Sequence, residues 1–122
     1  MEVNMQKIEE KAKSLGRALG QSDTVKALAR AEESLREEEE VKEEFEKVQK
    51  LQSELMQKSQ SGEEISEEKQ QELKDAMSEL EKRSEFQQFV ASQSNFEKLM
   101  KQVNEFIQQG ISEGQDSKIV EI

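Results

Sequence analysis

Apolar side chains recur every three or four positions through most of the chain, and this spacing restricts the fold more than any other feature. In the middle of the chain the stripe contains Val41, Phe45, Val48, Gln52 and Leu55. Residues at these steps lie on one face of an α-helix. No segment alternates with a period of two for long enough to build a sheet. The sequence therefore predicts an all-α fold, an antiparallel bundle of long amphipathic helices with a helical hairpin at its core.

The composition fits helices but would also fit disorder. The mean hydropathy is -0.98 and the formal net charge is -10, values that many unfolded chains share. However, Ala, Glu, Lys, Leu and Arg make up about half of the 122 residues. That share is typical of long or coiled helices when the apolar residues also keep a helical period. Because they do so here, we expect ordered helices.

Two interruptions divide the middle of the chain. The four adjacent carboxylates Glu37–Glu40 have a poor apolar pattern, and we expect a kink or a short break in the helix there, although a continuous helix also fits the sequence. A clearer turn is predicted at residues 59–66, which contain Gly62. Ser66 is followed by two acidic residues and is a good N-terminal cap for the next helix.

The last predicted helix has the broadest apolar face. Its apolar residues are Phe86, Phe89, Val90, Phe96, Leu99, Met100, Val103, Phe106, Ile107 and Ile111. A thin helical hairpin of this size offers little surface to cover such a face. We therefore expect a second copy or another protein to cover part of it, most simply in a symmetric homodimer. The sequence predicts a single helical domain over residues 1–111 and a flexible tail over residues 112–122.

The composition removes most catalytic chemistry. The chain has no histidine and no cysteine, so it lacks the usual general base, the commonest zinc ligand and any thiolate site. The carboxylates of Glu37–Glu40 are adjacent in sequence, and adjacent helical residues point in different directions and cannot converge on one ion. We predict no enzymatic activity, no cofactor and no metal site.

The acidic balance also limits the partners. Contact with nucleic-acid phosphates or with an anionic membrane surface needs clustered Lys or Arg, and the chain has 18 basic against 28 acidic residues. No apolar run is long enough to span a bilayer. We expect a cytoplasmic protein that binds neither nucleic acid nor membrane directly.

The residues predicted to form an oligomer or partner interface lie on two helices. They are Phe45, Val48, Gln52 and Leu55 on the middle helix, and Phe89, Phe96, Met100 and Val103 on the last one. Gln52 has two interpretations: a helix edge near solvent, or a polar residue that sets the register of a helix–helix contact. The phenylalanine stripe likewise fits either a core or a binding groove.

Two function classes follow from amphipathic helices without catalytic groups. The first is a regulatory interaction protein that self-associates and binds a discrete protein partner. The alternative is a prefoldin-like holdase, whose apolar helix tips capture unfolded chains. A discrete stoichiometric partner favours the first class, and suppression of aggregation of an unrelated client favours the second.

Six segments of the chain together form a recognisable pattern: Leu15 and Leu19 before residues 22–26, the acidic run Glu37–Glu40, Phe45-x-x-Val48-Gln49-x-Leu51-Gln52, Met56-Gln57 before Gly62-Glu63, Ser84-x-Phe86-x-x-Phe89, and Phe96-x-x-Leu99-Met100-x-x-Val103 with Ile107. With this pattern the chain resembles the YlbF/YmcA (Com_YlbF) family of small helical proteins from Gram-positive bacteria. The chain most resembles the uncharacterised YheA-like branch. The resemblance implies an oligomeric, non-enzymatic helical protein of the cytoplasm. Its relatives are implicated in competence, sporulation and biofilm development, and some act in a complex that directs the endonuclease RNase Y.

Overall fold

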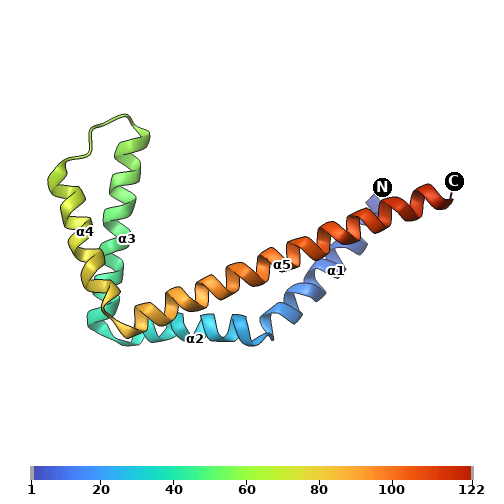
Figure 1. Cartoon of the computed structure of the whole chain (residues 1–122), viewed down its shortest axis with the longest axis horizontal. Helices are drawn as coiled ribbons and strands as arrows, with labels where there is room; N and C mark the ends of the chain where they lie inside the picture. Colours follow the sequence, from blue (N-terminus) through green and yellow to red (C-terminus); the bar gives the residue numbers. More distant parts are fainter. Residues whose placement is uncertain (1, 122) are drawn as a thin grey trace. The chain divides into compact units, whose positions relative to one another are not determined.

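The chain is built from helices alone over the residues that the structure describes. A computed structural model describes the backbone of residues 2–121 and the side chains of residues 4–116. In that range there are five α-helices and no β-strand (Figure 1): α1 (Glu2–Gly20), α2 (Asp23–Glu37), α3 (Glu39–Gln60), α4 (Glu67–Glu81) and α5 (Ser84–Glu121). The predicted all-α fold is confirmed.

Contacts divide the chain into two compact units. Residues 27–91 form the first, called here the hairpin unit, which contains most of α2, all of α3 and α4, and the first turns of α5. Residues 1–26 and 92–122 form the second, called here the terminal unit, which contains α1 and most of α5. A single domain over residues 1–111 stays a prediction.

The hairpin unit is organised by the turn between α3 and α4. Gly62 has a φ of 80°, a left-handed conformation that glycine adopts without strain. The hydroxyl oxygen of Ser66 then accepts a hydrogen bond from the backbone N–H of Lys69 at 3.2 Å and caps α4. Both the turn and the cap agree with the sequence prediction. The two helices consequently pack antiparallel against each other (Figure 1).

The acidic segment marks the break between α2 and α3. Helix α2 ends at Glu37 and α3 begins at Glu39, while Glu38 is extended with φ -88° and ψ 108°. The break has an electrostatic reason. Carboxylates are unfavourable at the C-terminal end of a helix and favourable in its first turn, where Glu39 and Glu40 lie.

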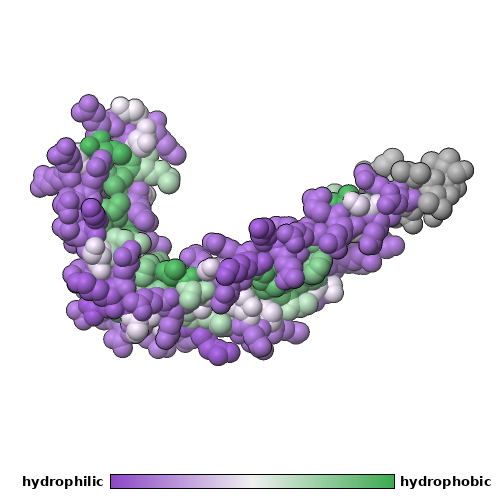
Figure 2. Space-filling model, viewed as in Figure 1, coloured by the Kyte–Doolittle hydropathy of each residue, from purple (hydrophilic) through white to green (hydrophobic). Residues whose placement is uncertain are grey.

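The core of the hairpin unit joins four helices. Its buried residues are Leu35 of α2, Val41 and Val48 of α3, Leu80 of α4 and Phe86 of α5. Leu80 has no solvent exposure at all (0%). Figure 2 shows apolar residues, in green, along the hairpin of α3 and α4 between purple polar residues. The hairpin thus has a core of its own.

In the terminal unit, α5 extends further than its sequence pattern predicts. The helix continues to Glu121, whereas the sequence predicts a flexible tail from residue 112. Gly110 and Gly114 lie inside the helix, and neither has a positive φ. Glycine inside a helix costs only about 1 kcal/mol relative to alanine, which does not force the helix to end.

Candidate interaction surfaces

Arg83, which lies between α4 and α5, forms ion pairs with two carboxylates of α3. Its Nη2 atom lies 2.6 Å from Oε1 of Glu44 and its Nε atom 3.1 Å from Oε2, a two-pronged contact. Nη2 also lies 3.0 Å from Oε1 of Glu40. The hydrogen bonds and the positive charge of Arg83 lower the pKa of Glu44 despite partial desolvation. Glu44 and Glu40 in turn raise the pKa of Arg83, so the Arg83–Glu44 pair is ionised at neutral pH.

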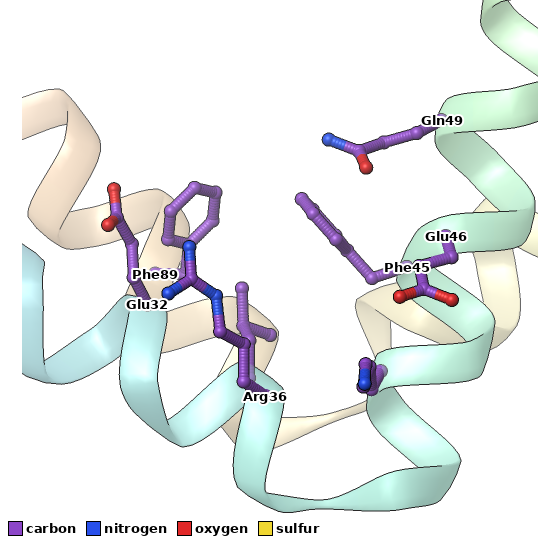
Figure 3. Close-up of a pocket in the computed structure, with 8 residues that line it drawn as sticks. Glu32, Arg36, Phe45, Glu46, Gln49 and Phe89 are labelled. Carbon is purple, nitrogen blue, oxygen red and sulfur yellow. The ribbon is translucent and has the colours of Figure 1, made fainter.

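A hollow of about 540 Å³ lies where α2 meets α3, and Figure 3 shows its side chains. Leu35, Phe45 and Phe89 supply apolar surface. The rings of Phe45 and Phe89 meet edge to face, with their centroids 5.8 Å apart. Four charged side chains also line the hollow: Glu32, Arg36, Lys42 and Glu46. None of them has an ion-pair partner among the side chains that the structure describes.

A second, smaller hollow of about 400 Å³ lies on the side of the hairpin. Gln52 of α3 lines it together with Leu73 and Met77 of α4. Both apolar side chains are half-buried, while Gln52 is exposed. Four residues further along α3, Met56 is 63% exposed.

In the terminal unit, apolar side chains are mostly exposed. On α5, Phe106 is 59% exposed, Ile107 45% and Ile111 50%. On α1, Met5 is 65% exposed and Ile8 58%. Single exposed apolar residues are common on protein surfaces, but a row of them at helical spacing points to a binding surface.

Five of the residues predicted for the interface lie in the hairpin unit, and their surroundings differ. Phe45 and Phe89 contact each other at the hollow between α2 and α3 and pack against the core. Val48 is part of that core and offers no free surface. Leu55 is half-buried on α3, and Gln52 is exposed beside the side hollow.

The three other predicted residues lie in the terminal unit. Phe96 and Met100 are half-buried and line an open hollow of about 730 Å³ along α5. Val103 is buried, at 8% exposure. Hence six of the eight predicted positions keep accessible surface, and the role of all eight in an interface stays a prediction.

Sequence reasoning missed the contact between Arg83 and Glu44. These residues are 39 positions apart in sequence, and helical periodicity gives no information about contacts at that distance. The sequence carries one weak signal for this contact: Arg83 lies two residues after the end of α4, and a cation is favourable near the C-terminal end of a helix.

Two further observations concern other kinds of site. Within residues 4–116, no group of three or more carboxylates is placed to hold a metal ion. Among the described helices, none has the length and apolar character needed to cross a bilayer.

The fold and these surfaces define a small protein made of amphipathic helices. Residues 8–112 match the family model described as "Control of competence regulator ComK, YlbF/YmcA". The chain therefore belongs to the Com_YlbF family. The family resemblance inferred from the sequence is confirmed.

Two individual proteins are similar over most of the chain. A UPF0342 protein from Staphylococcus saprophyticus is 28% identical over 102 residues, which is 84% of this chain and 90% of that protein. A solved structure of a protein of unknown function (DUF964) from Bacillus stearothermophilus has a TM-score of 0.72 at 21% identity. The match covers 87% of this chain and 93% of the solved chain. At that identity, the similarity supports the helical fold alone.

Proposed function

We propose that this chain is a non-catalytic regulatory protein of the cytoplasm that self-associates and binds another protein through the apolar row of α5. The observation that supports this function is the exposure of Phe106, Ile107 and Ile111, at 45–59%. Burying apolar area against another chain is the dominant favourable term in most protein association.

Family membership supports the regulatory part of the proposal. The family model carries the description of control of a competence regulator, and the resemblance seen in the sequence extends to RNA processing and development. Regulation through protein contacts requires no catalytic group. It does require a surface that a partner can recognise.

Light scattering after size exclusion tests self-association. We expect a mass of at least two chains at micromolar concentration. A monomer that also fails to bind an apolar dye would contradict the proposal, because it would show neither association nor an apolar surface. Phe96→Asp places a charge on the half-buried part of α5 and should dissociate or unfold the protein.

Partner binding is tested by pull-down from the native cytoplasm with Phe106→Glu as the variant. The matched control is Val90→Glu, since Val90 lies on the same helix and is 46% exposed. We expect a stoichiometric partner that the wild type and Val90→Glu retain and Phe106→Glu loses. Equal retention by both variants would argue against the α5 row. Suppression of aggregation of an unrelated client would instead indicate the holdase.

A further inference from the structure

We propose that residues 103–116 of α5 bind an amphipathic helix of a partner protein whose polar flank is basic, and that Gly110 and Gly114 let this helix approach closely. The inference rests on the partner binding in the proposed function and names the chemistry of that partner. A helix that lays its apolar face on another protein is a common mode of peptide recognition, with anchor residues at helical spacing.

The first argument is the pair of glycines inside α5. Gly110 and Gly114 lie within the helix and neither has a positive φ, so no turn requires them. A Cβ added at either position would meet no side chain and no other segment within 4 Å, so no close contact in the described part of the chain requires them either. Glycine nevertheless weakens a helix relative to alanine. What a missing Cβ provides is room for the backbone of another helix to come close.

The second argument is the apolar surface around these glycines. Phe106 and Ile107 lie four and three residues before Gly110, and Ile111 lies three residues before Gly114, so these side chains border the glycines on the helix surface. All three are exposed, at 59%, 45% and 50%. The glycines are thus low points between large apolar side chains. An amphipathic helix that crosses α5 here can bury all three.

The third argument is the charge beside this face. Between residues 102 and 116, where the described side chains end, the charged residues are Glu105, Glu113 and Asp116, with no Lys or Arg. None of these carboxylates has an ion-pair partner among the described side chains. Glu113 lies seven residues after Phe106 and therefore borders the apolar face on that side. A basic flank on the bound helix would meet these carboxylates, whereas an acidic flank would be repelled.

Two synthetic peptides test the chemistry of the partner. The first is an amphipathic peptide of Leu, Ala and Lys with its leucines on one helical face, and the second has Glu in place of every Lys. Fluorescence anisotropy of the labelled peptides measures binding to the full chain. We expect the Lys peptide to bind and the Glu peptide to bind at least about tenfold more weakly. Equal affinities would overturn the assignment of a basic partner.

A pair of charge reversals shows whether this attraction is local, since the whole chain has a net charge of -10. We expect E113K/D116K to raise the dissociation constant of the Lys peptide by about tenfold or more. The control E63K/E64K makes the same change in net charge at exposed positions of the hairpin unit and should change it much less. An equal loss in both variants would indicate general attraction and overturn the site on α5.

Gly110→Leu tests the close approach. Leucine favours the helix and adds apolar surface, so a partner that only buries apolar area should bind this variant more tightly. We expect instead about tenfold weaker binding, because the added side chain holds the bound helix away. The matched control is Ser112→Leu, at an exposed position on the opposite side of α5. Circular dichroism confirms that both variants are folded. Unchanged or tighter binding by Gly110→Leu would overturn the inference.

Two further outcomes separate this inference from the proposed function. A chain that binds neither peptide, but whose cellular partner is lost on Phe106→Glu, would overturn the basic helix and leave the proposed function standing. A mass in light scattering that falls on Gly110→Leu would assign this face to a second copy and would also overturn the inference. If neither peptide binds and Phe106→Glu retains every partner, both proposals fail.

Discussion

The two units of this protein use their apolar residues in opposite ways. Among the side chains that the structure describes, every buried core residue except Val103 lies in the hairpin unit. Most exposed large apolar residues lie instead in the terminal unit, on α1 and α5. The same kind of amphipathic helix therefore buries its apolar face in one unit and leaves much of it exposed in the other. An apolar face is buried or exposed according to whether a second helix packs on it, as α4 does on α3.

Among the variants that test this contrast, Leu80→Ala should lose the most unfolding free energy. Leu80 is fully buried, and truncation of such a leucine costs about 2–5 kcal/mol of unfolding free energy. The matched change Ile107→Ala, at a residue 45% exposed on α5, should stay within about 0.5 kcal/mol. Urea unfolding followed by circular dichroism measures both. Equal losses would erase the distinction between the units.

Arg83→Met should give the next largest effect and a characteristic pH dependence. Hydrogen bonding to Arg83 lowers the pKa of Glu44 below its ordinary value of 4.5. The stabilisation that the Arg83–Glu44 contact provides is therefore fully present above pH 4.5, and it is lost as the pH falls through the lower pKa of Glu44 in the folded state. We expect Arg83→Met to be less stable than wild type at pH 7, with the difference shrinking in acid.

Glu44→Gln is the control for the Arg83 experiment, since it removes the group that titrates. Thermal unfolding between neutral and acidic pH should show a smaller pH dependence in this variant than in the wild type. A difference between wild type and Arg83→Met that stays constant into strong acid would rule out Glu44 as the group responsible.

A smaller effect is expected at the start of α4. Ser66→Ala removes the acceptor of the 3.2 Å hydrogen bond from Lys69 N–H and should cost about 1 kcal/mol. Ser61→Ala changes an exposed serine of the same turn and should stay within about 0.5 kcal/mol. Both are measured by urea unfolding. If the two changes were equal, the cap would not contribute to the stability of the hairpin.

The local features of the fold could be predicted from the sequence, and the contacts between distant segments could not. The helices, the break beside Glu38 and the cap at Ser66 depend on neighbouring residues, whose periodicity and charge can be read directly. The continuation of α5 past Gly110 could not be predicted, because a glycine weakens a helix without ending it. Within the candidate surfaces, the helical spacing from Val41 to Leu55 predicted Val48 and Gln52 equally as interface residues. Only the packing of α4 separates them, burying Val48 and leaving Gln52 exposed.

The complete burial of Leu80 has a consequence for how the hairpin unit unfolds. Its cluster takes one or more side chains from each of α2, α3, α4 and α5, so no single helix can detach without exposing the others. Regions that share contacts in this way open together as one cooperative unit. The backbone amides of α3 and α4 should then exchange with solvent deuterium at a common rate, whichever end of the hairpin they occupy.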